Sequence, residues 1–445
     1  MMFHLRRTIW AGLLALGTIV RLAATDVVTV EFPASGVPGE LAFPATFHLW
    51  LPPSVKRIQA IIVHQHGCGD GAENSGETAA LDLQWRALAI RHDAALLSPH
   101  YHAGDKQECR LWCDPRNGSA KIYLKALDAL AQQTGHPELA QVPWCLWGHS
   151  GGAFWSSLML EKYPERIVAI YCRSGAAATA WLKGEIPEPQ FTAEAYRVPI
   201  ILNPGLKERG DRQFNGAWDA TSHFFDLFRS HHAPVTFAPD PLSSHDCRNS
   251  RLLALPFFDA CLNLRLSRRS SSLKTIPYRS GWTGDWTTGE VRRQAPSSTN
   301  LSWLPDSLTA EAFSQYVRIG RIIDKTPPRK APVIVSAVGS HKQAYLEWTA
   351  EADFESGIAQ FVIYRDGVEL ARIPEKPNDR TGFSQFQGLS YHDTPAPKTP
   401  ELRFIDQGPL SGKPPRYQIS VINGDGMEGP KSRSVRPVIQ HDFLP

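Results

Sequence analysis

Short apolar runs alternate with amphipathic stretches between residues 45 and 264, and this alternation most constrains the fold of the chain. Runs of four to six residues suit buried strands, and the stretches between them have helical periodicity. The pattern predicts an α/β fold, in which helices cover both faces of a doubly wound, mostly parallel sheet. The predicted buried strands are Ile58–Val63, Ala94–Ser98, Pro143–Trp147, Ile167–Cys172, Pro199–Leu202 and Val235–Ala238. The predicted helices are Ala79–His92, Ala120–Gln133, Ala153–Lys162, Trp218–Arg229 and Leu252–Leu264, and Val27–Phe32 and Ala45–Leu51 are expected to add antiparallel strands at one edge.

The pattern changes after the last of these helices. Residues 266–331 contain a Ser/Arg-rich stretch, a Trp/Gly/Thr-rich stretch and a proline-punctuated end, and we expect a linker that packs against the first domain. Residues 332–445 alternate polar and apolar residues and contain the hairpin signals Asp366-Gly367 and Asn423-Gly424. We therefore predict an α/β domain at 25–265 and a β-sandwich at 332–445.

The first residues have the pattern of an export signal. Arg6 and Arg7 precede an apolar run from Ile9 to Val20, and small Ala24 could end the segment. The run is shorter than the roughly 20 residues that a membrane span requires. We expect residues 1–24 to be removed, which leaves a secreted or periplasmic protein without a membrane span.

Charge and cysteine content limit the partners and cofactors. The chain has 47 basic and 44 acidic residues, a net charge of +3, which provides no electrostatic footprint for nucleic acid. Cys145 and Cys172 lie in apolar runs and are expected in the core, whereas the loop-like cysteines are candidates for disulfides in an oxidising compartment. These candidates are Cys68, Cys109, Cys113 and Cys247. No Cys-x-x-Cys pair or tight His/Cys cluster supports zinc, so no metal or cofactor is expected.

A glycine-flanked serine follows the strand predicted at Pro143–Trp147. The sequence Gly148-His-Ser150-Gly-Gly152 has the Gly-x-Ser-x-Gly pattern and runs directly into a predicted helix. A sharp strand-to-helix turn exposes the serine hydroxyl, and the glycines leave room for the neighbouring backbone. Ser150 is the predicted nucleophile.

A serine nucleophile needs a base that a third group orients. His245 lies in the loop after the last predicted strand, where the base belongs if the order is serine, acid, histidine. Glu208 follows the preceding strand, three positions after Gly205, and is our first candidate for the acid, with Asp211 as the alternative.

The oxyanion of a tetrahedral intermediate needs N–H donors. The residue after the nucleophile, Gly151, is expected to supply one. The second donor should come from the glycine-rich loop after Ile58–Val63, where the amide of Cys68 is the candidate.

These motifs resemble those of the α/β-hydrolase superfamily over residues 45–264. Within it, the His66-Gly-Cys-Gly69 loop and the short connections look like those of secreted polyhydroxybutyrate depolymerases and feruloyl esterases. The C-terminal part resembles a fibronectin type III domain in its Leu346–Trp348 strand, its Ile363–Gly367 element and Tyr417. The resemblance implies either a passive spacer or a module that contacts carbohydrate or protein.

The resemblance implies an exported serine esterase. Only residues 173–197 lie where a lid would be inserted, so an open site is expected, suited to carbohydrate-linked or polymeric esters. Trp112, Trp155 and Trp181 could present aromatic faces to such a substrate. Two alternatives stay open: a serine peptidase of the prolyl-oligopeptidase type, and a non-catalytic extracellular binding protein.

Overall fold

The computed structural model describes residues 27–69, 72–104, 108–267, 272–340, 342–396, 401–408 and 413–440. The predicted export signal at residues 1–24 lies outside these ranges. Within them, none of the helices has the length and hydropathy that a membrane-spanning segment needs.

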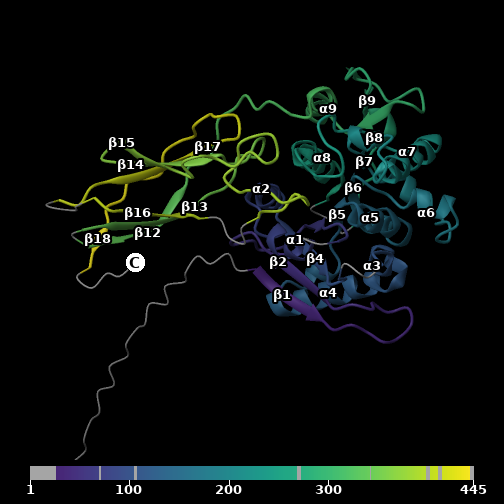
Figure 1. The fold of residues 1–445 in the computed structure, drawn as a ribbon, viewed down its shortest axis with the longest axis horizontal. Coiled ribbons are helices and arrows are strands. Elements are labelled where there is room, and N and C mark those ends of the chain that lie inside the picture. The colour runs from purple at the N-terminus through teal and green to yellow at the C-terminus, as the bar shows by residue number, and fades with distance from the viewer. Residues whose placement is uncertain are drawn as a thin grey trace, which may run out of the picture.

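An eight-stranded sheet forms the centre of the N-terminal part, with the strand order β1-β2-β4-β3-β5-β6-β7-β8 (Figure 1). β1 and β2 are antiparallel to their neighbours, and the strands from β4 to β8 are parallel. This arrangement confirms the predicted α/β class and the two antiparallel edge strands, and it fits an α/β hydrolase. The strands are β1 (Val27–Phe32), β2 (Ala45–Trp50), β3 (Ala60–Gln65), β4 (Ala94–Tyr101), β5 (Trp144–His149), β6 (Ile167–Arg173), β7 (Ile200–Asn203) and β8 (Val235–Phe237).

Helices cover both faces of this sheet, which explains why the central strands are buried throughout and mostly apolar. The helices are α1 (Ala72–Ala79), α2 (Leu83–Arg91), α3 (Arg110–Cys113), α4 (Ser119–Thr134), α5 (Gly151–Lys162), α6 (Ala178–Leu182), α7 (Asn215–Ser230) and α8 (Ser250–Arg265). Short 3₁₀ turns are η1 (Pro115–Asn117), η2 (Pro137–Ala140), η3 (Pro164–Arg166), η4 (Ala195–Arg197), η5 (Leu206–Glu208) and η6 (Tyr278–Ser280).

The single helix predicted over Ala79–His92 is wrong, because α1 ends at its first residue and α2 begins four residues later. Asp82 causes the break. Its carboxylate accepts hydrogen bonds from the Gln84 and Trp85 amides at 2.9 and 3.0 Å, and these bonds cap the new helix.

The segment that follows α8 packs back onto the sheet. It contains β9 (Trp282–Gly284), β10 (Val291–Arg292), β11 (Ser302–Leu304) and α9 (Ser307–Ile319). The Phe237 amide of β8 donates a hydrogen bond to the Ser302 hydroxyl at 3.0 Å, and Trp303 and Phe313 are fully buried. The segment therefore extends the core of the N-terminal part.

Two further sheets form the C-terminal part, beside α2 (Figure 1). Their strand orders are β16-β13-β12-β18 and β15-β14-β17, and Trp348, Phe361 and Tyr417 are buried between them. The strands are β12 (Val333–Gly339), β13 (Ala344–Thr349), β14 (Gln360–Arg365), β15 (Val368–Ile373), β16 (Arg403–Asp406), β17 (Tyr417–Ile422) and β18 (Val438–Ile439).

A buried ion-pair network joins the two parts of the chain. Arg251 of α8 contacts Asp82 beside α2 and Asp393 of the C-terminal part, each at 2.7 Å. The side chains of the three residues are at most 2% exposed. Leu83 and Ala87 of α2 belong to the same apolar cluster as Trp348, so the contact also includes a shared core.

Replacing Arg251 with alanine should lower the free energy of unfolding by about 3 to 5 kcal/mol, because two buried carboxylates would lose their cation. Urea denaturation measures the change. The exposed pair Arg372–Glu369 provides the control, and Arg372→Ala should change the same quantity by less than about 1 kcal/mol. A similar small change for Arg251→Ala would contradict the assigned role of the network.

Candidate active site

Ser150 occupies the sharp turn between β5 and α5. Its backbone has φ 53° and ψ −113°, an unusual conformation that local packing maintains. The turn needs both flanking glycines. A Cβ atom at Gly148 would lie 2.3 Å from the Gly152 carbonyl carbon, and one at Gly152 would lie 2.4 Å from the Gln65 carbonyl oxygen. The predicted strand–turn–helix context of the serine is therefore present.

His245 lies in the loop after β8 and faces this serine. Its Nε2 atom is 2.9 Å from the Ser150 Oγ atom, and its side chain is 12% exposed, so the pair can be reached from solvent. The Phe214 ring stacks on the imidazole with a centroid distance of 4.4 Å and an interplanar angle of 7°. The stack restricts rotation of the imidazole.

Glu208 ends η5 and contacts the other side of the same imidazole. Its Oε1 atom is 2.6 Å from His245 Nδ1, and its Oε2 atom accepts a hydrogen bond from the Gly205 amide at 3.1 Å. The carboxylate is completely buried. Asp211 instead accepts hydrogen bonds from the Gln213 and Phe214 amides, both at 2.8 Å, and stabilises the turn before α7. Of the two candidate acids, the structure brings Glu208 to the histidine.

Arg173, at the end of β6, fixes the loop that carries His245. Its buried guanidinium donates to the Ser243 hydroxyl at 2.6 Å and to the Ser244 carbonyl at 3.0 Å, and also to the Asp246 carbonyl. Burial acts to lower the pKa of Arg173, but Asp240 together with the nearby Tyr316 and Glu208 acts in the opposite direction, and the pKa is raised. Arg173 was not predicted from the sequence, although a charged residue at the end of an otherwise uncharged buried strand was a usable signal.

His149 also fixes the loop, and it was not assigned a role from the sequence. The ring is fully buried, and its Nε2 atom donates to the His245 carbonyl at 2.6 Å. Burial, followed by the nearby His392 and His245, holds the pKa of His149 well below its usual value. The imidazole is therefore neutral at ordinary pH.

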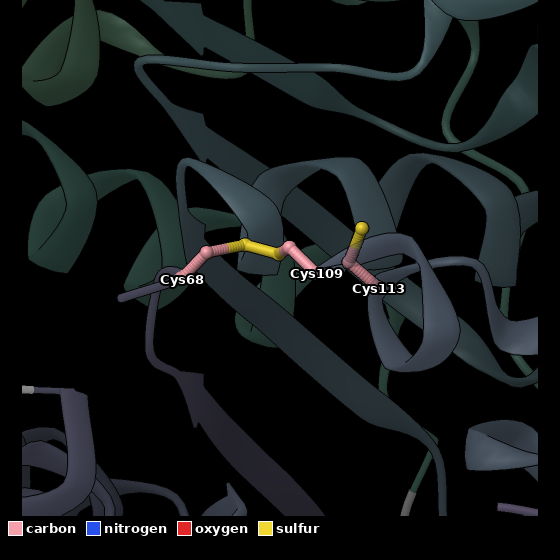
Figure 2. A group of neighbouring side chains, drawn as sticks. All are labelled: Cys68, Cys109 and Cys113. Carbon is pink, nitrogen blue, oxygen red and sulfur yellow. A yellow bond between two sulfur atoms is a disulfide. The ribbon is translucent and has the colours of Figure 1, made fainter. Parts of the chain in front are cut away.

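The two residues predicted as oxyanion donors lie side by side. A Cβ atom at Gly151 would be 2.1 Å from the Cys68 sulfur, so the loop after β3 lies directly over the start of α5. Cys68 forms a disulfide with Cys109 (Figure 2). The bridge ties the loop after β3 to the residue that precedes α3.

The other predicted bridge partners are wrong. Cys113 and Cys247 are free, buried thiols, although Cys113 lies beside the bridge (Figure 2). Burial raises the pKa of the thiols of Cys113 and Cys247, so both stay protonated. Cys145 and Cys172 are also buried and free, which confirms their assignment to the core.

Removing the bridge with Cys68→Ser and Cys109→Ser together should lower the free energy of unfolding by about 3 to 4 kcal/mol, because the bridge closes a loop of 41 residues. Thermal unfolding with and without a reductant measures the effect. The matched control is Cys113→Ser, which leaves the bridge intact and should keep the sensitivity to reductant. If reductant leaves the melting temperature of the unmodified protein unchanged, the bridge does not have this stabilising role.

The three tryptophans proposed as substrate platforms are packed instead. Trp112, Trp155 and Trp181 are 1%, 0% and 7% exposed. All three belong to the same buried apolar cluster, and burial of their large apolar surface explains their place. Between β6 and β7, where every residue is described, only α6 and η4 form, so the expected short connection is confirmed.

Two groups of side chains among the described residues could each offer three ligand atoms to a metal ion. In the first, Cys68 and Cys109 share the disulfide, which leaves only the Cys113 thiol. The second is Asp324, Asp353 and Glu355 in the C-terminal part. Burial raises the pKa of Asp353 to about 7, and the neighbouring Glu355 and Asp324 add to this effect. Neither group includes Ser150, His245 or Glu208.

Comparisons with known proteins give matches among solved structures, several of which are hydrolases. No model of a known protein family and no curated protein matches the sequence. S-formylglutathione hydrolase from Agrobacterium tumefaciens is 14% identical, with a TM-score of 0.34 over 51% of this chain and 91% of that one. Siderophore hydrolase EstA from Aspergillus nidulans is 14% identical, with a TM-score of 0.34 over 54% and 93%. Acylaminoacyl peptidase from Pyrococcus horikoshii is 11% identical, with a TM-score of 0.36 over 52% and 41%. At these identities and TM-scores, the functions of the matched proteins are not assigned to this chain. The roles of its residues are argued from the geometry of the site.

Proposed function

We propose that the protein is a serine hydrolase that cleaves carboxylic esters through an acyl-enzyme. The observation that supports this proposal is the continuous hydrogen-bonded row from Glu208 through His245 to Ser150, with contacts of 2.6 and 2.9 Å. A buried carboxylate that orients an imidazole, and an imidazole that contacts the serine hydroxyl, form the arrangement that activates a serine nucleophile.

In the proposed reaction, Ser150 Oγ attacks the ester carbonyl carbon while His245 Nε2 takes the hydroxyl proton. Glu208 stabilises the imidazolium that forms. The amides of Gly151 and Cys68 donate to the oxyanion of the tetrahedral intermediate. The intermediate collapses, the bond to the alcohol oxygen breaks, and His245 gives its proton to the departing alcohol. Water then attacks the acyl-enzyme by the same steps, which releases the carboxylic acid and restores the serine.

We further propose that the enzyme is exported and acts on bulky substrates, such as polysaccharide esters or polyesters. The pattern of residues 1–24 and the Cys68–Cys109 bridge support export. The short connection between β6 and β7 supports an open site that needs no lid movement. No nucleic acid, metal or cofactor enters the proposal.

The proposed organisation is a signal at 1–24, a catalytic domain at 25–265, a linking and packing segment at 266–331 and a fibronectin type III-like domain at 332–445. The two facing sheets of four and three strands, with Trp348 and Tyr417 buried between them, support the last assignment.

Hydrolysis of a small substrate panel tests the proposed activity. Protein that lacks residues 1–24 would be assayed with p-nitrophenyl acetate and butyrate, methyl ferulate, a hydroxybutyrate oligomer and a peptide anilide. We expect turnover of the esters and none of the anilide. Turnover of the anilide in preference to the esters would instead support a peptidase, and no turnover of any substrate would support a binding protein.

A further inference from the structure

A loop of the C-terminal part, residues 386–396, reaches the candidate active site and lies more than 140 positions from His245 in the sequence. This loop contains Tyr391 and His392. The His392 Nδ1 atom is 2.8 Å from the His149 Nδ1 atom, a distance that fits one shared proton. Because His149 also donates to the His245 carbonyl, the loop is connected to the catalytic histidine through a single ring.

Three further contacts fix this loop. Asp393 pairs with the buried Arg251 at 2.7 Å, and Arg251 also donates to the Asp393 carbonyl at 3.2 Å. The Tyr391 carbonyl accepts a hydrogen bond at 3.1 Å from the amide of Cys247, which lies two residues after His245. The backbone of Tyr391 is therefore held by the catalytic loop itself.

The side chain of Tyr391 differs from its neighbours because it is 41% exposed, whereas His392 and Asp393 are buried. Its ring centroid lies 5.2 Å from that of His149 and 6.3 Å from that of His245. The ring is thus a solvent-accessible aromatic surface at the edge of the catalytic imidazole. Its fixed backbone places it there without the entropy cost of ordering a mobile loop.

The chemistry of the proposed function decides which half of the substrate this surface meets. His245 must return its proton to the oxygen of the leaving alcohol, so that oxygen lies near Nε2 in the transition state. The acyl group is attached to Ser150, and its carbonyl oxygen points to the amides of Gly151 and Cys68. Aromatic groups beside the imidazole therefore meet the alcohol rather than the acyl chain.

We propose that Tyr391, supplied by the C-terminal part of the chain, binds the alcohol portion of the ester and favours alcohols with a ring. This inference rests on the proposed ester hydrolysis. It assigns the C-terminal part a role in substrate selection, in place of a spacer. An aromatic ring packs against a flat apolar face of a ring in the alcohol, which a methyl group cannot offer.

The test uses pairs of esters that differ either in the alcohol or in the acyl group. Benzyl acetate and methyl acetate compare the alcohols, and methyl butyrate and methyl acetate compare the acyl groups. For each protein, the ratio of the two kcat/KM values is measured on one preparation, so the fraction of correctly folded protein cancels. Tyr391→Ala should lower the benzyl-to-methyl ratio about five- to tenfold and leave the butyrate-to-acetate ratio unchanged.

Two comparison variants complete the design. Tyr391→Phe should keep the wild-type benzyl-to-methyl ratio, because the ring remains. Leu370→Ala changes a side chain of similar exposure, 40%, on β15 and should also keep it. An unchanged benzyl-to-methyl ratio in Tyr391→Ala, or a changed butyrate-to-acetate ratio, would overturn the inference. If the wild-type protein hydrolyses none of these esters, the proposed function fails instead.

Discussion

Replacing Ser150 with alanine should reduce kcat for ester hydrolysis by a factor on the order of 10⁵ to 10⁶. The variant keeps the turn and the candidate oxyanion donors but loses the atom that would bond to the substrate. His245→Ala should cost about as much, because an alcohol without a base is a poor nucleophile at neutral pH. Initial rates with a p-nitrophenyl ester measure both losses.

The double variant distinguishes a triad from independent contributions. Residues that act as one unit give strongly non-additive losses, so Ser150→Ala combined with His245→Ala should be no slower than either single variant. Ser230→Ala, an exposed serine at the end of α7, is the matched control and should keep full activity. A loss of kcat in the double variant that equals the product of the two single losses would contradict the shared mechanism. Turnover retained by Ser150→Ala would contradict it as well.

Replacing Glu208 with glutamine should reduce kcat by about 10³- to 10⁴-fold. The amide has the same shape and can still accept from the Gly205 amide, but it carries no charge to stabilise the imidazolium of His245. KM should change little, because Glu208 is completely buried and does not face the substrate. Rates at saturating ester give kcat directly.

Asp211→Asn is the control for this loss. Its side-chain oxygen can still accept from the Gln213 and Phe214 amides, so activity should stay within about twofold of wild type. Full activity in Glu208→Gln together with a large loss in Asp211→Asn would show that Asp211, and not Glu208, is the acid. A loss in both would point to damage of the loop that holds them.

The sequence was sufficient to predict the features that local pattern encodes. Apolar runs with helical spacing between them predicted the α/β sheet, and glycines around Ser150 predicted the turn that only they can make. The position of His245 after the last strand followed from strand order. The spacing after Gly205 ranked Glu208 before Asp211 but left both open, because both follow β7 and only the three-dimensional path of η5 brings one to the imidazole.

Features that depend on contacts distant in sequence escaped prediction. Asp82 looked like part of one helix, yet its capping bonds end that pattern, and it pairs with Arg251. Tyr391 and His392 follow no motif, and only folding brings their loop to His245. The positions of cysteines and tryptophans in the sequence showed which residues could form disulfides or stack on a substrate. Which of them are free to do so depends on their burial in the fold.

Covalent labelling with a fluorophosphonate tests most directly whether Ser150 is an activated nucleophile. The reagent would be added to the purified protein, and the modified peptide would be identified by mass spectrometry. We predict one adduct, on Ser150, that is absent from Ser150→Ala and strongly slowed in His245→Ala. No adduct on the folded wild-type protein, or an adduct on a different residue, would contradict the account.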